Sequence, residues 1–515
     1  MEDLESRRLL SANGGGVTPP TVDPALFAPQ NPRNVGTVVA FQYNEDESGT
    51  NRGLNDTFNR AEVLPLGTLP GQEDTIDVNG SMGLAFNGQN QIVTDVDTYA
   101  VDLRAGDIFD ISLTGSAGNI NIFYGTGTSR PGAFWFGTDI NTAVSDPLTG
   151  EALYAKGSPL QTVGTAVAAQ TIPEDGRYYI ALAPSNTVNN YTMGLRVYRP
   201  VLEQAPIGAK QIVYVDFDGG IYPTSQISGS TLPLGMVRFD SLRENLDVLG
   251  FTDPRAVDYE ALQREIVEEM RKQFATLIPN GNNGDFDSTG NPGEYGVTVL
   301  STLECPEFSP HLRNSEYCSP DLDLTSNPLV TRILVGAEIS DIGIPTVGIA
   351  ESVDIGNFRP GEISVVVVDD ALALSSVPLS PGVSQLNATA KFLAGVITHE
   401  AGHTFGERHT DTDNTVFNIM DSGSQQAGEA FIGVGRDGIF GTPDDMQSEF
   451  TEDEFALEGF IGYSRTAASL SFNLSTGRVG STISGRVFND VNRDGSGAGD
   501  DGLGGVTIFA DIDGD

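Results

Sequence analysis

Three of the four histidines in this 515-residue chain fall within one stretch of eleven residues that reads HEAGHTFGERH. The stretch closes an apolar segment rich in small residues, 385–406, which we expect to be a helix that runs through a core. On a helix, His399 and His403 are about 40° apart in azimuth, so both imidazoles project from one face. Gly406 can take the left-handed conformation that ends a helix. The chain can then turn sharply and bring His409 to the same point.

Three imidazoles that converge on one point can hold a zinc ion whose fourth position stays open, and an open position is typical of catalytic zinc. We therefore predict that His399, His403 and His409 bind zinc. Glu400 follows the first ligand directly, so its carboxylate can reach a metal-bound water without becoming a ligand. That placement predicts a general base, which takes the proton of the water. A structural zinc would need a fourth protein ligand, and the motif contains none.

A methionine follows the histidines in FNIMDSG, where Met420 lies eleven residues beyond His409. HExxHxxGxxH with a downstream Met-turn resembles the metzincin zinc peptidases. The resemblance, in a domain that we place at 201–467, implies a zinc-dependent endopeptidase with a mixed twisted sheet, an active-site helix, and Met420 packed beneath the zinc ligands. It also implies a final helix over 451–466 and a substrate-pairing edge strand over 346–352. Taken alone, Met420 could also be an ordinary core methionine.

Among the metzincins, the arrangement is more similar to matrixins and to snake-venom-type reprolysins than to astacins or serralysins, because no tyrosine lies two residues after Met420. The alternative function is a surface or adhesion protein whose peptidase fold is vestigial and inactive. The intact Glu400 argues against that alternative.

The rest of this domain predicts a mixed α/β arrangement, in which a strand, a helix and further strands precede the histidine-bearing helix. The helix at 258–277 carries an apolar stripe with charged residues elsewhere. The segment Ile363–Val368 is apolar except for Ser364, so that strand should be buried on both faces. The expected strands are 211–219, 295–302, 331–338 and 362–370, and the stripe consists of Leu262, Ile266, Met270, Phe274 and Leu277.

Residues 37–200 contain short segments in which apolar and polar residues alternate, which predicts half-buried strands and, in series, a β-sandwich. The clearest segments are 97–103, 107–115, 119–125, 177–183 and 191–198. GLNDTFNRAEVLPLG, DVDTYAVDLRAGDIFDISLTGS and GRYYIALAP resemble parts of the bacterial pre-peptidase C-terminal (PPC) domain, a small β-sandwich appended to secreted peptidases. The resemblance implies an accessory binding or targeting module, and a spacer without a ligand is the alternative.

Both ends of the chain have the composition of accessory segments. Residues 1–36 are rich in Gly, Pro and Asn and predict a flexible leader, whose LESRRLLSA resembles the export-type motif of large bacterial surface proteins. A linker is expected at 468–480. Residues 481–515 resemble the start of a B-repeat module of bacterial surface adhesins, a β-sandwich that we expect to continue past the end of this sequence.

The B-repeat-like segment contains DVNRDGSGAGDD, which follows the spacing of a twelve-residue calcium loop. Its candidate calcium ligands are Asp490, Asn492, Asp494, Ser496 and Asp501. Aspartate stands at the last position, where glutamate is usual. An unliganded acidic turn is the alternative reading of this loop.

The chain is strongly acidic, with 70 Asp and Glu against 28 Lys and Arg and a formal net charge of −42. That charge opposes binding to nucleic acid and to anionic membrane surfaces, and no apolar run is long enough to predict a membrane span. We expect a protein or peptide substrate, a bacterial protein that is secreted or held at the cell surface, and surface association through the accessory β-domains. The two cysteines, Cys305 and Cys318, enclose a short hydrophilic loop. In an oxidising compartment they should form a disulfide, with two reduced thiols as the alternative.

Overall fold

The computed structural model of the chain describes residues 37–477 apart from several gaps. The longer gaps are 46–53, 125–133, 138–153, 203–210, 224–234, 278–296, 370–376 and 423–432, with shorter ones of up to five residues between them. All described residues belong to one compact unit that ends at Arg478. This described part is mostly β-structure, with two long helices.

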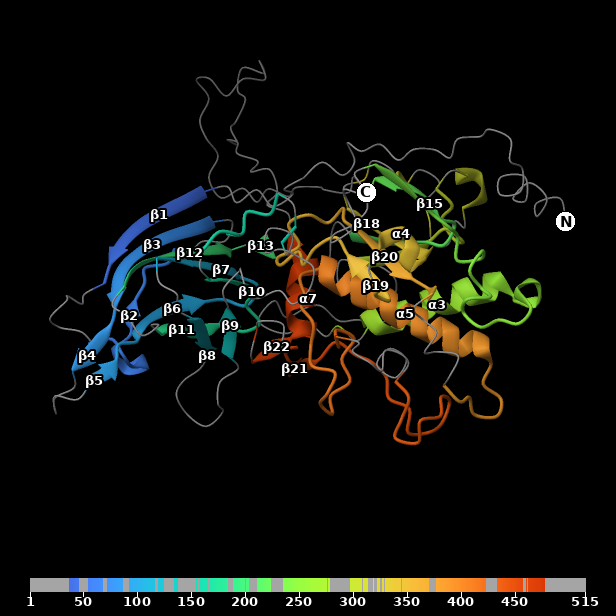
Figure 1. The fold of residues 1–515 in the computed structure, drawn as a ribbon. Helices are drawn as coiled ribbons and strands as arrows, with labels where there is room; N and C mark the ends of the chain where they lie inside the picture. Colours follow the sequence, from blue (N-terminus) through green and yellow to red (C-terminus); the bar gives the residue numbers. More distant parts are fainter. Residues whose placement is uncertain are drawn as a thin grey trace, which may run out of the picture. The chain divides into compact units, whose positions relative to one another are not determined.

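Two five-stranded sheets between Thr37 and Arg199 pack face to face as a β-sandwich (Figure 1). The first sheet has the order β1 (Thr37–Asn44), β3 (Gln72–Met82), β12 (Asn189–Arg199), β7 (Ile108–Thr114) and β10 (Ala166–Thr171). The second has the order β2 (Glu62–Val63), β6 (Asp97–Leu103), β11 (Gly176–Ala183), β8 (Asn119–Tyr124) and β9 (Phe134–Gly137). One core joins them, with Ile76 and Phe109 from the first sheet and Tyr178 from the second. The alternating segments are therefore strands, as expected.

Strand β7 is more deeply buried than its alternating sequence predicts. Along this strand only Thr114 is exposed. A later loop covers the polar face, where the backbone N of Gln161 donates to Oδ2 of Asp110 at 2.9 Å. Ser112 Oγ donates to the carbonyl oxygen of Val163 at 2.8 Å. Because these polar groups bond to the loop, they are accommodated away from solvent.

A second layered structure is built around another five-stranded sheet. Its order is β17 (Val297–Ser301), β14 (Gln211–Asp216), β18 (Val330–Ala337), β20 (Ile363–Val367) and β19 (Gly348–Ala350). The first four strands are parallel, and β19 runs antiparallel to β20. The strands expected here are present. The segment 346–352 contains the outermost strand on that side of the described sheet.

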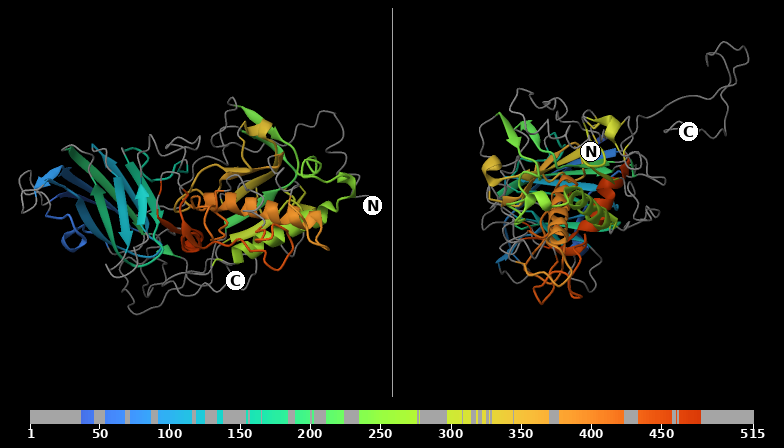
Figure 2. Two further views of the ribbon diagram at one scale, coloured as in Figure 1. Left: turned by 60° about the horizontal axis from the view of Figure 1, so that its bottom comes forward. Right: turned by 90° about the vertical axis from the view of Figure 1, so that its right-hand side faces the viewer.

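Two long helices, α3 (Tyr259–Ala275) and α5 (Gln385–Thr404), lie side by side along this sheet (Figures 1 and 2). The apolar stripe predicted for 258–277 is buried, since each of its five side chains is at most 4% exposed. The segment Ile363–Val368 is buried along its whole length, as predicted. Valines of β14 pack against the helices, and the residues between them pack on the opposite face.

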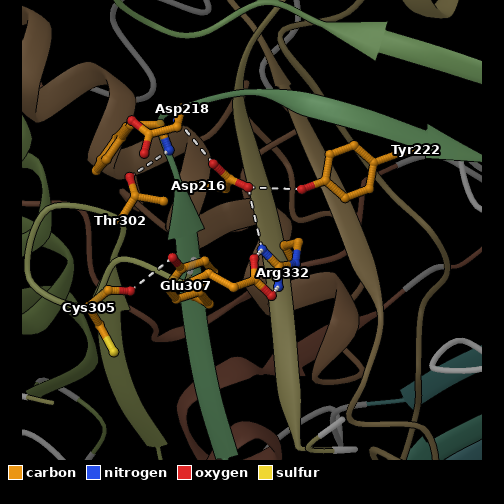
Figure 3. A network of polar contacts seen from close by, with 9 residues as sticks. Asp216, Asp218, Tyr222, Thr302, Cys305, Glu307 and Arg332 are labelled. Carbon is orange, nitrogen blue, oxygen red and sulfur yellow. Dashed lines mark hydrogen bonds and ion pairs between the residues drawn. The ribbon is translucent and has the colours of Figure 1, made fainter. Parts of the chain in front are cut away.

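Cys305 and Cys318 form a disulfide in the loop that follows β17. Figure 3 shows how this loop is held to the sheet. The guanidinium of Arg332 in β18 donates to both carboxylate oxygens of Glu307, at 2.9 and 2.8 Å, and lies 3.4 Å from Oδ2 of Asp216. The two carboxylates compensate the charge of the buried arginine. Because Glu307 belongs to the loop and Arg332 to the sheet, their ion pair holds the loop on the face of the sheet opposite α5.

The segment 451–466 is not the helix that the family resemblance implied. It contains two short paired strands, β21 (Glu452–Glu454) and β22 (Tyr463–Arg465). Gly462 has a φ of 117°, which a helix does not allow. The final helix, α7 (Thr466–Ser475), begins where that segment ends, and its Leu470 and Leu474 join the core beside α3 and α5. The core thus continues past 467, into residues for which a linker was expected.

The remaining described elements are short. They are η2 (Phe58–Arg60), β4 (Leu84–Phe86), β5 (Ile92–Thr94), β13 (Val201–Leu202), β15 (Gly220–Pro223), β16 (Met236–Phe239), η4 (Pro254–Ala256), η6 (Pro310–Leu312), α4 (Ile339–Ile342) and β23 (Thr476–Gly477). Strand β4 pairs with β5, β13 with β23, and β15 with β16. Among the helices of the described ranges, none has the length and apolar character needed to span a bilayer.

Candidate metal centre and active site

Helix α5 carries the histidine motif through the core. Its first turn is capped by Ser384, whose Oγ accepts from the backbone N of Asn387 at 3.2 Å. Most of its side chains are buried. The helix ends because Gly406 takes a left-handed φ of 99°, after which the backbone N of Glu407 donates to the carbonyl oxygen of Gly402 at 3.0 Å. The apolar segment therefore gives a buried helix with a sharp exit.

The sharp exit brings all three motif histidines together. Nε2 of His403 lies 3.1 Å from Nε2 of His399 and 3.1 Å from Nε2 of His409. Their potential ligand nitrogens lie within 4.8 Å of one another, and no other such group of three was found among the described residues. His399 and His403 are buried, whereas His409 is partly exposed. His409 is therefore the one member of the cluster that solvent reaches in part.

The second ring nitrogen of two of these histidines is bound to the main chain. Nδ1 of His399 lies 2.7 Å from the carbonyl oxygen of Ile419, and Nδ1 of His403 lies 2.7 Å from that of Glu407. A carbonyl oxygen only accepts, so each Nδ1 donates and each Nε2 keeps a lone pair. Burial, followed by the neighbouring His403 and His409, holds the pKa of His399 well below its ordinary value. Both helical imidazoles are thus oriented by the main chain, and the neutral form of His399 is favoured.

Converging lone pairs repel one another unless a cation lies between them. Two nitrogens bound at about 2.0 Å in tetrahedral geometry are about 3.3 Å apart, close to the two 3.1 Å separations in this cluster. Imidazole nitrogens suit zinc, and bonds from the second ring nitrogen to carbonyl oxygens commonly orient metal-binding histidines. The three histidines therefore fit a zinc ion.

Glu400 lies where the helix meets the outermost described strand of the sheet, and it is only 3% exposed. A Cβ added to Gly348 would lie 2.2 Å from Oε1 of Glu400 and 2.7 Å from its Cδ. The carboxylate therefore packs directly against the backbone of β19, in space that a larger residue would fill.

Met420 is fully buried beneath the helix. A Cβ added to Gly402 would lie 2.3 Å from Sδ of Met420, so the sulfur occupies the space below the residue that precedes His403. The carbonyl oxygen of Met420 also accepts from the backbone N of Thr410 at 2.8 Å. The methionine turn thus contacts both the helix and the residue that follows His409.

A polar bridge that sequence reasoning missed joins these two segments. Oγ1 of Thr410 donates to Oδ1 of Asp421 at 2.9 Å, and the backbone N of Asn418 donates to Oδ2 of the same carboxylate at 3.2 Å. Burial raises the pKa of Asp421 to about 7. The sequence offers one hint of this pair: Thr410 directly follows His409, and Asp421 directly follows Met420. Their pairing becomes visible only once the turn is folded.

The other candidate residues lie apart from this cluster. Cys305 and Cys318 form the disulfide already described. The calcium candidates Asp490, Asn492, Asp494, Ser496 and Asp501 lie outside the described residues, as does the leader at 1–36. Calcium binding therefore stays a prediction.

Comparison with known protein families gives a match at the histidine site. Residues 376–451 match the model of the Peptidase_M57 family, described as a dual-action HEIGH metallo-peptidase. The matched segment includes His399, Glu400, His403, His409 and Met420. The match supports a metallopeptidase as the class of protein. No curated protein matches the chain at a significant level.

Solved structures give weak likenesses. PliG from Salmonella Typhimurium, a periplasmic inhibitor of g-type lysozyme, is 17% identical over 27% of this chain and 98% of its own, with a TM-score of 0.17. PliG from Aeromonas hydrophila is 11% identical over 31% of this chain and 98% of its own, with a TM-score of 0.15. CorA, a surface-associated copper-binding protein of Methylomicrobium album BG8, is 13% identical over 31% of this chain and 98% of its own, with a TM-score of 0.15. At these scores the likenesses carry no argument about function.

Proposed function

We propose that this chain is a zinc-dependent endopeptidase of the metzincin type that acts outside the bacterial cell. His399, His403 and His409 hold the zinc, and Glu400 is the general base. The observation that carries the proposal is the convergence of three Nε2 atoms. The buried Glu400 directly follows the first of these histidines on the same helix. The Peptidase_M57 match over the same segment supports it.

The residues of the chain prepare this site for peptide hydrolysis. When bound, zinc would polarise the scissile carbonyl group and lower the pKa of a water molecule to about 7. The role of Glu400 is to take a proton from the attacking water and pass it to the leaving amide nitrogen. Packing against Gly348 restricts where its carboxylate can lie. Burial of Glu400 also limits its contact with bulk solvent.

Strand β19 offers a place for an extended substrate. It runs antiparallel to β20 at the edge of the described sheet, and its Gly348 contacts Glu400. A peptide that adds to a sheet edge is held by main-chain hydrogen bonds, which do not depend on its side chains. Such binding would bring a peptide bond of the substrate close to the general base.

The finer parts of the proposal come from sequence resemblance. Met420 would be the Met-turn of a matrixin- or reprolysin-like enzyme. The export-type leader and the PPC-like sandwich support secretion or attachment at the cell surface. The acidic loop with Asp490, Asn492, Asp494, Ser496 and Asp501 would bind calcium, separately from the zinc chemistry.

Three variants of the full chain test the proposed roles on a denatured protein substrate. Glu400→Gln should keep near-stoichiometric zinc and lose at least about 100-fold in activity, because the base is removed and the ligands remain. His403→Ala should lose both zinc and activity. Glu260→Gln, a matched control on the exposed first turn of α3, should retain both. Wild-type activity in Glu400→Gln would show that the assigned mechanism is wrong.

A further inference from the structure

Arg408 directly precedes His409, yet its side chain is buried, with 6% exposed. Its guanidinium lies 4.1 Å from the centre of the Phe460 ring. From there it reaches the β-sandwich, with Nη1 3.5 Å from the carbonyl oxygen of Ala169 in β10 and Nη2 3.4 Å from Oη of Tyr154. These hydrogen bonds are long, but a buried arginine depends on such acceptors. The residue before the third histidine is therefore attached to the sandwich.

Three backbone carbonyl groups in the histidine segment accept hydrogen bonds from residues outside it. The bonds run from the N of Asp354 to the O of His403 (3.0 Å), from Nδ2 of Asn473 to the O of Phe405 (2.7 Å) and from the N of Ala456 to the O of His409 (3.1 Å). The donors come from three separate stretches of the chain. Together they fix the path of the backbone from the end of α5 to the third histidine.

Two of these donors, Asn473 and Ala456, are each linked to the sandwich through one other residue. Oγ1 of Thr171, at the end of β10, donates to Oδ1 of Asn473 at 2.8 Å, and both residues are buried. Phe455, the neighbour of Ala456, belongs to the sandwich core and also forms a β-bridge with Thr410. The sandwich thus contacts residues that lie next to the backbone at both Phe405 and His409.

The third donor, Asp354, lies in a stretch that packs against the sandwich through apolar side chains. Its neighbours Val353 and Ile355 share one buried cluster with Ile108 of β7. The cluster also contains Phe358 and Tyr198, whose rings meet edge to face at 5.4 Å. Gly406 lies where these stretches converge, because an added Cβ would be 2.8 Å from Cα of Ile355 and 2.8 Å from Nδ2 of Asn473.

We infer that the β-sandwich positions the third histidine, with Arg408 as the positioning residue that acts through His409. His399 and His403 are placed by their own helix, whereas His409 lies beyond the helix end and its place depends on the path of the loop. The sandwich holds that loop through Arg408 and through the partners of its carbonyl groups. This gives the sandwich a role that neither a separate binding module nor a spacer describes. The inference depends on the proposed zinc site.

The test measures how fast the full chain loses zinc to a chromogenic chelator, well below its unfolding temperature. Arg408→Ala should accelerate zinc loss about 10- to 100-fold, the usual range when a group that orients a ligand is removed. Thr171→Val keeps the shape of the side chain and removes its hydrogen bond to Asn473, so it should accelerate zinc loss severalfold. Arg408→Lys should not restore the wild-type rate, because an ammonium group cannot reproduce a planar fork.

The control is Ile180→Val, which weakens the sandwich core within β11 and leaves the histidine loop untouched. Its zinc loss should stay within about twofold of wild type. The visible spectrum of the Co²⁺-substituted protein should change in Arg408→Ala and remain unchanged in the control. That readout reports ligand geometry rather than overall stability.

Wild-type rates of zinc loss in both Arg408→Ala and Thr171→Val would overturn the inference, and so would equal acceleration in Ile180→Val. If Arg408→Ala does not fold, Thr171→Val decides. A wild-type chain that binds no zinc at all would instead overturn the proposed function, and the inference with it. The two failures are therefore distinguishable.

Discussion

Gly348→Ala should abolish most activity without removing zinc, because the added methyl group would occupy the space of Glu400, the proposed general base. The new Cβ would lie 2.2 Å from Oε1 of Glu400, and ordinary contact begins at 3.4 Å. The oxygen must therefore move by about 1.2 Å, and a misplacement of about 1 Å can cost about 100-fold in rate. We expect kcat/KM to fall by about 100-fold, within the range attributed to general-base catalysis.

The assay combines steady-state hydrolysis of a peptide substrate with zinc analysis of the same preparation. Zinc content should stay near wild type, because the three atoms nearest to the added Cβ all belong to Glu400 and none to a histidine that would hold the metal. Gly438→Ala is the matched control, since its added Cβ would meet no atom within 4 Å. Gly438 has a φ of 68°, so this change should cost about 1 kcal/mol in stability and leave activity intact. Unchanged kcat/KM in Gly348→Ala would refute the placement of Glu400.

Three further predictions address the surroundings of the site. Gly402→Ala should push Met420 away from the helix, since the added Cβ would lie 2.3 Å from Sδ, and should lower both zinc content and melting temperature. The double change Cys305→Ser and Cys318→Ser removes a disulfide between residues 13 positions apart. It should lower the free energy of unfolding, measured in urea, by about 3 kcal/mol and leave the zinc content unaffected. Burial raises the pKa of Asp110 from 3.8 to about 7, so the folded state binds the proton more tightly and stability should fall as pH rises from about 4 to 7. In Asp110→Asn, the urea unfolding midpoint should change less with pH over that range. An unchanged dependence on pH would contradict the raised pKa of Asp110.

The histidine site could be predicted from sequence because its chemistry is local. The helix, the glycine that ends it and all three histidines lie within one short segment, so periodicity and a single turn suffice to bring the nitrogens together. Strand β6 could likewise be located from its alternation of apolar and polar residues, and β14 from its apolar and β-branched residues. Each of these features depends on residues that are neighbours along the chain.

The contacts around the site could not be predicted, because they join residues that are distant in sequence. Thr171 and Asn473 are 302 positions apart, and nothing near either residue indicates the other. An arginine in a loop is expected at the surface, but Arg408 is buried because the sandwich covers it. The segment 451–466 was assigned to a helix by family resemblance, whereas pairing between β21 and β22 decides its structure.

The most direct test of a zinc peptidase centre at these histidines is proteolysis of a denatured protein substrate by the purified full chain, measured before and after zinc removal. We expect about one zinc per chain, loss of activity in a chelator, and recovery when one equivalent of zinc is returned. The Glu400→Gln protein should take up the same equivalent of zinc and stay inactive. Proteolysis that persists in the zinc-depleted wild type, or that Glu400→Gln recovers with zinc, would contradict the claim that this site is a zinc peptidase centre.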